Sequence, residues 1–335
     1  MIPVSLAGTA SYLPATVRDN AFFQRDGDVA TAHGPMFRGS RLRHHVAEDE
    51  TAVDMIVKAT RSLADKLGLD LTRDVDLILT NVSCPDIPFT GSGALVSREL
   101  GCQPMFILDL HNTGCISFVF MMSVARSLMT TMGAKTALLC NVQTSAGRVF
   151  AHPDNRFLPQ AAVPGDGCGV GYLVASDESP VRAIATRSYG EFSADMQVKS
   201  DDGGAWWAPR TTPLHIDFTE SRVATIVSRG NALVPKIIRE ACAAAELDVE
   251  DIDVLVTNQP NPVFLRNWRE SLLLPPEAHV HTFEEHGNLF GAAIPISLER
   301  AADTGKLTPG ANVVIGGFSH AGDYAGAAVV TWRPN

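Results

Sequence analysis

The sequence predicts an α/β protein made of two duplicated halves, and two internal repeats support this fold class. Segments 74–81 and 251–258 read DVDLILTN and DIDVLVTN. Segments 133–139 and 310–315 read GAKTALL and GANVVI, and the members of both pairs start 177 residues apart. Because one offset recurs at two separate places, we expect a duplicated unit, with halves spanning residues 1–177 and 178–335.

Each half shows the same order of elements. An amphipathic helix is expected at 52–67 in the first half and at 223–245 in the second. An acidic turn then leads to the repeated apolar strand, and a further buried strand follows at 137–141 or 313–317. Continuous Val, Ile and Leu strands that alternate with helices indicate sheets buried on both faces, so the halves would pack in layers through their helices. The segment 188–218 is expected to be a loop between the halves.

Cys115 is the most informative residue for function, because it follows a β-type run at 105–110 and a short polar turn. It begins an apolar helical stretch at 116–129. A thiol at a helix N-terminus feels the positive end of the helix dipole, which predicts a lowered pKa and a nucleophilic thiolate. A buried cysteine that acts as a small hydrophobic residue is the alternative. Ligands bind at the carboxyl ends of strands in such sheets, where Cys115, Asn258 and the loop at 316–320 would converge.

The composition excludes several classes of protein. The chain is 45% hydrophobic and 19% charged, and its formal net charge of -10 comes without a basic run, which argues against nucleic-acid binding. Its six cysteines show no Cys-x-x-Cys spacing, so we expect no metal site, no disulfides and a reducing cytoplasm. No charged leader is visible, and the apolar segment 116–128 is expected to be too short to span a bilayer.

Five motifs in chain order carry a family resemblance. They are an Arg-rich segment at 38–51, a Pro-Asp loop at 80–86, the stretch around Cys115, a Gly-Asp-Gly turn at 165–169, and HGN at 286–288 followed by AAIP at 292–295. Together they resemble the β-ketoacyl-[acyl-carrier-protein] synthase III-like condensing enzymes of the thiolase superfamily, over essentially the whole chain. The resemblance implies a thiolase-like five-layer αβαβα fold, a homodimer, and transfer of an acyl group from coenzyme A through Cys115.

The chain departs from the family pattern at two places. The family's His-Gln-Ala-Asn motif reads NQPN at 258–261, so Asn258 occupies the position of the catalytic histidine. The catalytic asparagine is kept as Asn288, while the C-terminal glycine-rich loop carries SHAGD at 319–323. Asparagine can donate a hydrogen bond to an enolate oxygen, but it cannot become cationic or shuttle a proton. The departure therefore argues against decarboxylative condensation, which depends on stabilising that oxygen.

Transfer of an acyl group to an alcohol or amine needs an activated thiol, an oxyanion hole and a base. The backbone N–H of Cys115 and a second N–H after Phe318 could form the oxyanion hole. His320 in the altered loop is the candidate base, and His286 is the second candidate. A solvent-exposed polar loop residue is the alternative for His320.

Arginines could bind the phosphates of coenzyme A, because guanidinium pairs with phosphate through two hydrogen bonds. The candidates lie in the family's Arg-rich segment and after the strand that ends at Asn141, and they are Arg38, Arg41, Arg43, Arg148 and Arg156. Solvated surface charge is the alternative for each of them.

The leading hypothesis is an acyltransferase on a synthase III scaffold, acting in secondary metabolism such as polyketide assembly. It would load an acyl group from acyl-coenzyme A or acyl carrier protein onto Cys115 and pass it to an oxygen or nitrogen acceptor or to a carrier. We expect no permanently bound cofactor. One alternative is a decarboxylative condensing enzyme that starts fatty acid or polyketide chains, with Asn258 and Asn288 sharing the oxyanion. The other is a non-catalytic partner subunit, against which the preserved Cys115 counts.

Overall fold

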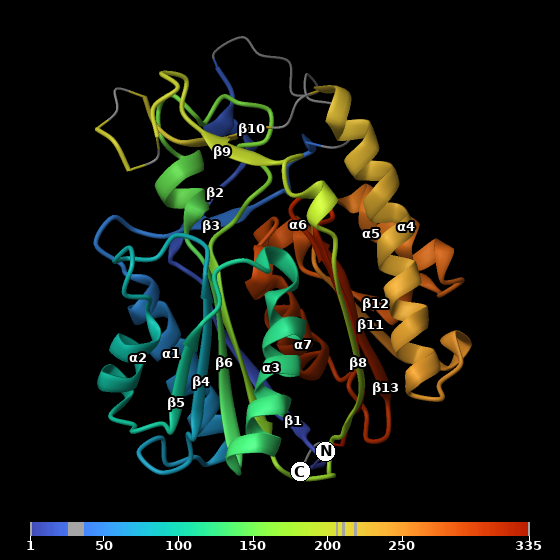
Figure 1. The fold of residues 1–335 in the computed structure, drawn as a ribbon. Helices are drawn as coiled ribbons and strands as arrows, with labels where there is room; N and C mark the ends of the chain where they lie inside the picture. The colour runs from blue at the N-terminus through green and yellow to red at the C-terminus, as the bar shows by residue number, and fades with distance from the viewer. Residues whose placement is uncertain (1, 26–36, 206, 210–211, 218–219, 334–335) are drawn as a thin grey trace.

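The computed structural model describes residues 2–25, 37–205, 207–209, 212–217 and 220–333 and confirms the expected α/β fold. Two five-stranded sheets form its frame (Figure 1). The first has the order β1-β7-β6-β4-β5, with β1 Ser5–Tyr12, β4 Leu77–Val82, β5 Phe106–Asp109, β6 Thr136–Gln143 and β7 Gly167–Val174. The second has the order β8-β14-β13-β11-β12, with β8 Val181–Ser188, β11 Val254–Thr257, β12 His279–Val280, β13 Asn312–Ser319 and β14 Tyr324–Thr331. The two sheets therefore correspond strand for strand.

Helices form three layers around the two sheets (Figure 1). α1 and α2 cover the outer face of the first sheet, α3 and α7 lie between the sheets, and α4 and α5 cover the outer face of the second. Their bounds are α1 Ala52–Leu67, α2 Gly93–Leu100, α3 Ser117–Met132, α4 Glu220–Ala244, α5 Pro262–Ser271, α6 Phe283–His286 and α7 Ala293–Asp303. The αβαβα arrangement that the resemblance implies is confirmed.

Local chemistry sets the bounds of α1, which match the expected helix. The Asp54 N–H donates to the Thr51 hydroxyl (3.0 Å), and the Asp54 carboxylate accepts from the Thr51 N–H (3.0 Å). This reciprocal capping box satisfies two N–H groups that have no partner within the helix. The helix ends at Gly68, whose φ of 66° lies in the left-handed region that glycine adopts without a Cβ clash.

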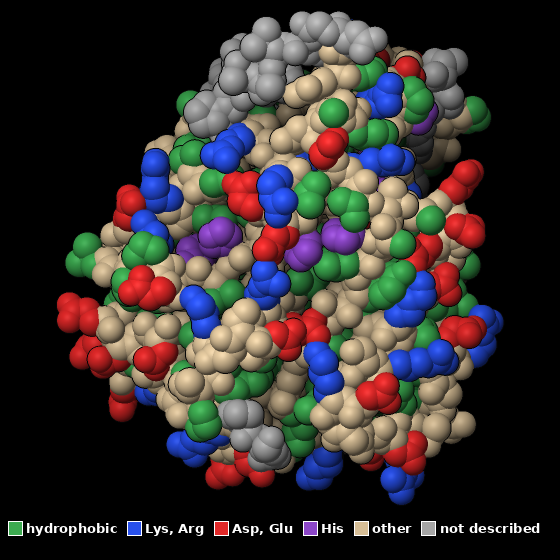
Figure 2. All heavy atoms as spheres, turned by 180° about the vertical axis from the view of Figure 1, so that it is seen from behind, with side chains coloured by type: hydrophobic (Ala, Val, Ile, Leu, Met, Phe, Trp, Pro, Cys, Tyr) green, Lys and Arg blue, Asp and Glu red, His purple; other side chains and the backbone are tan. Residues whose placement is uncertain are grey.

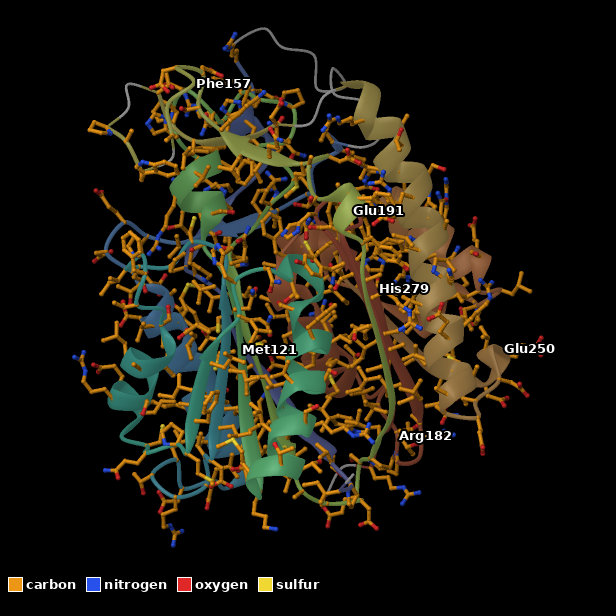
Figure 3. All side chains as sticks on the ribbon, in the orientation of Figure 1. Met121, Phe157, Arg182, Glu191, Glu250 and His279 are labelled. Atoms are coloured by element: carbon orange, nitrogen blue, oxygen red, sulfur yellow. The ribbon has the colours of Figure 1, made fainter. Side chains whose placement is uncertain are left out.

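The central helix α3 is buried on most sides. Phe118 and Met122 are fully buried, and Figure 3 shows Met121 between the two sheets. Together with the turn before it, α3 gives a 19-residue stretch, Gly114–Met132, that is long and apolar enough to cross a membrane. The expectation that this segment is too short is wrong, because the helix continues beyond residue 128. Its place between the sheets is that of a core helix.

Several segments differ from the expected elements. The segment 188–218 is not a simple loop, because β9 Gln197–Lys199 and β10 His215–Asp217 pair within it. The helix expected at 223–245 begins earlier, at Glu220. The boundary expected at 177/178 falls in the connection between β7 and β8. The remaining short elements are β2 Thr16–Arg18 and β3 Arg43–His45, which pair, and the one-turn helices η1 Asn20–Phe23, η5 Gly190–Phe192, η6 Val249–Asp251 and η7 Pro276–Ala278.

The molecular surface agrees with the charge pattern of the sequence. On the face seen in Figure 2, acidic and basic side chains are interspersed, and several histidines lie near the middle of the face.

Candidate active site

Cys115 lies in η3, a single 3₁₀ turn at Gly114–Ile116 that leads into α3. Hydrogen bonds attach this turn to the end of β13 in the second half. The Ile116 N–H donates to Ser319 Oγ (3.2 Å), and the Ser319 hydroxyl donates to the Thr113 carbonyl. The structure thus brings the Cys115 turn and the loop after β13 together, although 206 residues separate Thr113 from Ser319.

Burial raises the pKa of the Cys115 thiol to about 12, even though part of the residue is exposed to solvent. Repulsion from the Asp323 carboxylate acts in the same direction, while donors from the Cys115 and His320 backbones and from Asn258 lower the pKa. The prediction that the helix N-terminus produces a thiolate is therefore wrong for the resting protein. Desolvation outweighs the peptide dipoles, so the thiol is neutral at pH 7 and needs a base in order to react.

Two backbone N–H groups lie beside the sulfur. The N–H groups of Cys115 and His320 both act on the thiol as hydrogen-bond donors. The sequence predicted a second donor among the N–H groups that follow Phe318. The N–H of His320, two residues later, fits this prediction. Two backbone donors next to a nucleophile are what an oxyanion hole requires.

Asn258 follows β11 and is fixed by its oxygen. Its side-chain Oδ1 accepts from the Phe318 N–H (3.2 Å), and a Cβ on Gly317 would lie only 2.2 Å from that oxygen. Its Nδ2 atom is buried and has no oxygen or nitrogen acceptor among the described residues. Instead, a hydrogen bond from Asn258 lowers the pKa of the Cys115 thiol. The amide nitrogen is therefore a donor that is available to a group bound at the sulfur.

His320 is paired with a carboxylate that the sequence analysis did not select. Its Nδ1 lies 3.0 Å and 3.1 Å from the two carboxylate oxygens of Asp323. Its Nε2 faces the Cys115 turn, since a Cβ on Gly114 would lie 2.8 Å from it. A histidine with one nitrogen on a carboxylate and the other near a thiol has the arrangement of a general base.

The loop that carries His320 adopts an unfavourable backbone conformation. His320 has a φ of 49°, and a non-glycine residue in this left-handed region costs about 1–2 kcal/mol. Two contacts hold the loop: Arg229 Nη1 donates to the Ala321 carbonyl (2.6 Å), and the Tyr189 N–H donates to the Asp323 carbonyl (2.7 Å). Strain of this kind is found at functional sites, where surrounding contacts fix the geometry.

Asn288 precedes a short helix that packs on the Cys115 turn. Its Oδ1 accepts from the Phe290 N–H (3.1 Å), which begins the short helix η8, Phe290–Ala292. η8 packs directly on the Cys115 turn, because a Cβ on Gly291 would lie 2.9 Å from the Gly114 carbonyl oxygen. Asn288 therefore lies in the segment that contacts the thiol turn.

His286 occupies a different environment from His320. Its ring centroid lies 5.3 Å from that of His44, and burial lowers the pKa of His286 to about 4. Its Nδ1 is buried without a partner in the described part of the chain. His286 therefore lies beside His44, whereas His320 faces the Cys115 turn.

The five candidate arginines do not form one phosphate site. Arg43 is fully buried, donates to Asn20 Oδ1 (2.7 Å) and has a pKa lowered to about 10 by burial. Arg148 donates to the Cys84 carbonyl (3.0 Å) and pairs with Asp86 (2.9 Å). The predicted phosphate contact is wrong for Arg43, because solvent does not reach it, and the guanidinium of Arg148 is already bonded inside the protein.

The other three arginines lie nearer the surface. Arg38 pairs with Glu284 (3.3 Å), and the Arg41 N–H donates to the same carboxylate (3.2 Å). Arg156 packs its guanidinium over the rings of Phe22 and Phe157.

Sequence reasoning missed the roles of Ser319 and Asp323. Both lie in the loop that departs from the family pattern, so the departure itself was the available signal. The spacing of His320 and Asp323 does not predict their pairing, because it depends on the left-handed backbone at His320.

Two sheets of matching strand order around a shared helical layer, with a cysteine at the start of the central helix, define a thiolase-like protein. Comparisons with known proteins make this more specific. Residues 242–332 match the family described as 3-oxoacyl-[acyl-carrier-protein] synthase III C terminal. The chain is 29% identical over 322 residues to the β-ketoacyl-[acyl-carrier-protein] synthase III of Granulibacter bethesdensis, covering 92% of this chain and 94% of that protein.

Solved structures share the same fold. The 3-oxoacyl-[acyl-carrier-protein] synthase III of Aquifex aeolicus has a TM-score of 0.84 at 21% identity, covering 98% of this chain and all of that one. The priming β-ketosynthase of the R1128 polyketide pathway has a TM-score of 0.83 at 20% identity, covering 99% and 96% of the two chains. The chain therefore shares the thiolase-like fold of these enzymes, and it is similar to synthase III proteins over nearly its whole length, as its motifs indicate.

Proposed function

We propose that this protein is an acyltransferase that carries an acyl group on Cys115 and passes it to an oxygen or nitrogen acceptor. The acyl donor is an acyl-coenzyme A or an acyl carrier protein thioester. The observation that carries this proposal is the His320–Asp323 pair, whose Nε2 faces the turn that bears a protonated thiol. A base at this place compensates for the histidine that is absent at position 258.

The chain's residues divide the reaction between them. His320 Nε2 takes the proton of the Cys115 thiol as sulfur attacks the donor's carbonyl carbon, and the Cys115 and His320 N–H groups hold the resulting oxyanion. Collapse of this intermediate breaks the donor's C–S bond and returns the proton to the leaving thiolate. In the second half-reaction His320 takes a proton from the acceptor, the acceptor attacks, and Cys115 leaves and is reprotonated.

Asn258 stands where the family has its catalytic histidine. Its amide can donate a hydrogen bond, but it cannot transfer a proton as histidine does. Its unpartnered Nδ2 suits a thioester oxygen or sulfur in this site. Proton transfer then falls to His320, which supports acyl transfer over condensation. We place the reaction in specialised pathways such as polyketide assembly.

The partners of the family support two further assignments. Arg38, Arg41 and Arg156 are the remaining candidates for coenzyme A or carrier-protein phosphates, because Arg43 and Arg148 are bonded internally. A homodimer is supported by the edge strand β5, where Phe106 is 41% exposed, and by the neighbouring Met105, at 54%. An unpaired strand edge with exposed apolar side chains favours association with a second copy.

The second candidate is a decarboxylative condensing enzyme. The relatives named as synthase III favour it, as do Asn258 beside the thiol and Asn288 at the start of the segment that packs on the thiol turn. The two amides could share the enolate oxygen, although without a cationic group.

The test follows the acyl group. The protein is mixed with a panel of acyl-coenzyme A donors, and intact mass is recorded for the wild type and Cys115→Ala. We expect a mass increase by one acyl group in the wild type alone, and its loss on addition of alcohols or amines. Rapid carbon dioxide release and a β-ketoacyl product with malonyl carrier protein would instead establish the condensing enzyme. An absence of any adduct across the panel would point to a non-catalytic subunit.

A further inference from the structure

A cavity of about 240 Å³ lies against the His320–Asp323 pair, and the proposed reaction steps do not yet assign a ligand to it. Its walls come from the η5 segment and the loop after β13, and they consist of Phe192, Ser193, Met196, His320, Ala321 and Asp323. The volume is within the range that holds a small organic molecule, although it is smaller than a drug-sized site.

The His320–Asp323 pair borders the cavity and also acts on the Cys115 thiol. His320 lines the cavity, while its backbone N–H acts on Cys115 and its Nε2 faces Gly114. Asp323 also lines it and is close enough to raise the pKa of the thiol. A molecule in this cavity therefore contacts His320 and Asp323, and His320 also faces the Cys115 turn.

The charges around the cavity select the kind of molecule. Within the described part of the chain, neither lysine nor arginine contributes to its lining. The neighbouring Arg229 is engaged elsewhere: it pairs with Asp195 (2.9 Å), and its guanidinium lies 3.5 Å from the centre of the Phe192 ring. The anionic Asp323 faces the cavity, so a carboxylate or phosphate there would meet repulsion without a compensating cation.

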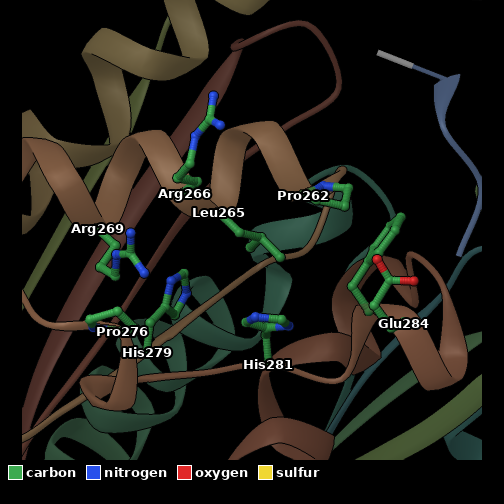
Figure 4. Close-up of a pocket in the computed structure, with 9 residues that line it drawn as sticks. Pro262, Leu265, Arg266, Arg269, Pro276, His279, His281 and Glu284 are labelled. Atoms are coloured by element: carbon green, nitrogen blue, oxygen red, sulfur yellow. The ribbon is translucent and has the colours of Figure 1, made fainter. Parts of the chain in front are cut away.

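A second cavity in the same half has the opposite character. Figure 4 shows Arg266, Arg269 and His281 around it, together with Glu284. An anionic molecule would find cationic partners in that lining, whereas the lining beside Asp323 offers none among the described residues. The contrast concerns the lining itself, because the nearby Arg229 is already bonded to Asp195 and to the Ala321 carbonyl.

We propose that the cavity lined by Phe192, Ser193 and Met196 is the acceptor subsite, and that it takes a small, largely apolar alcohol or amine without an anionic group. This assignment rests on the proposed acyl transfer and names the class of its acceptor. The acceptor's hydroxyl or amino group gives its proton to His320 Nε2 and forms a bond to the acyl carbon. The C–S bond breaks, and the Cys115 thiolate takes the proton back from His320.

The experiment fills the cavity without touching the catalytic groups. Ser193 is exposed, so Ser193→Trp places an indole over the cavity without entering a core, and Met196→Trp is the second filling variant. Val198→Trp is the matched control, because Val198 is 59% exposed and is not part of the lining. Each variant is first loaded with an acyl group on Cys115, and loading is measured by intact mass.

Release of the acyl group is then followed with three probes: hydroxylamine, 2-phenylethanol, and 3-phenyllactate as an alcohol that carries a carboxylate. We expect wild type and Val198→Trp to transfer to 2-phenylethanol at least tenfold faster than to 3-phenyllactate. Both filling variants should lose at least tenfold with 2-phenylethanol, while acyl loading and release by the small hydroxylamine stay unchanged.

Three outcomes overturn the assignment. Equal transfer to 2-phenylethanol by wild type and both filling variants would show that the acceptor binds elsewhere. Transfer to 3-phenyllactate as fast as to 2-phenylethanol would show that the cavity does not exclude anionic acceptors. Impaired loading with unchanged transfer would show that the cavity binds the acyl chain of the donor and not the acceptor. If the wild type loads but transfers to none of these acceptors, the proposed function itself fails, and that result is distinct from transfer that ignores residues 193 and 196.

Discussion

The two halves carry the same Thr-Asn dipeptide at corresponding places, within β4 and at the end of β11, but use its asparagine differently. Asn81, after Thr80 in the first half, donates its Nδ2 to the Leu110 carbonyl (2.8 Å). Asn258, which lies 177 residues later at the matching place, keeps its Nδ2 free of oxygen and nitrogen acceptors among the described residues and directs it at Cys115. One asparagine is structural, and its counterpart has hydrogen-bonding capacity left for chemistry.

The next pair of corresponding positions repeats this difference. Gln143 in the first half donates to Ser145 Oγ (2.8 Å) and accepts from the Ser83 hydroxyl. His320, again 177 residues later, holds Asp323 with one nitrogen and faces the thiol turn with the other. In the proposed reaction, the first half thus supplies the nucleophile, and the second half supplies the groups that activate it.

The largest effect is expected from His320→Gln, which gives position 320 the side chain of Gln143, its counterpart in the first half. Loss of a general base lowers a rate by about 10²–10⁴-fold, and glutamine cannot take a proton from the thiol at pH 7. We expect acylation of Cys115 to slow by that factor with little change in folding. The rate is measured by quenched-flow intact mass spectrometry. A variant that acylates within threefold of wild type would remove His320 from the mechanism.

The matched change in the first half is Gln143→Asn. The shorter side chain loses the contacts to Ser83 and Ser145, and a buried polar group without a partner costs about 1–3 kcal/mol. We expect a lower midpoint of chemical unfolding and an unchanged acylation rate for the folded protein. The two variants together therefore separate a catalytic role from a structural one.

Much of the scaffold could be predicted from the sequence because its causes are local. Thr51, Asp54 and Gly68 set the bounds of α1 through capping, and the repeat offset led to two corresponding sheets. The same offset pairs Asn258 with Asn81 and predicts its place after the repeated apolar strand.

The failures have causes that only the tertiary structure contains. The pKa of Cys115 is set by desolvation and by Asp323, which is 208 residues away in the chain, so the local dipole argument gave the wrong sign. Arg43 lies in the expected Arg-rich segment, but its burial beside Asn20 depends on how β3 packs. The His320–Asp323 pair forms with His320 at a positive φ, which histidine adopts more often than most residues but which its identity alone does not predict.

A smaller effect on rate is expected from the asparagine pair, of which only Asn258 is proposed to act on the reacting group. Asn258→Ala removes a donor at the reacting group, and loss of one such donor costs about 10²–10³-fold in rate. Asn81→Ala should leave the acylation rate of the folded protein unchanged and lower its stability by about 1–3 kcal/mol, because the Leu110 carbonyl loses its partner. Acylation rates and urea unfolding curves of both variants check this. Equal rate losses in the two variants would contradict the division between the halves.

The smallest effect is on the pH dependence of Cys115 alkylation. It tests whether the first half alone activates the thiol. With a pKa of about 12, the thiolate fraction rises as pH increases and falls about tenfold for each unit below that value. Alkylation of Cys115 by iodoacetamide should therefore accelerate by about tenfold per pH unit between pH 7 and 10, without a plateau. Peptide mapping distinguishes Cys115 from the partly exposed Cys84. A plateau from pH 7 upward would mean that the peptide dipoles of η3 and α3 already hold a thiolate, and the activating role assigned to the second half would then be unnecessary.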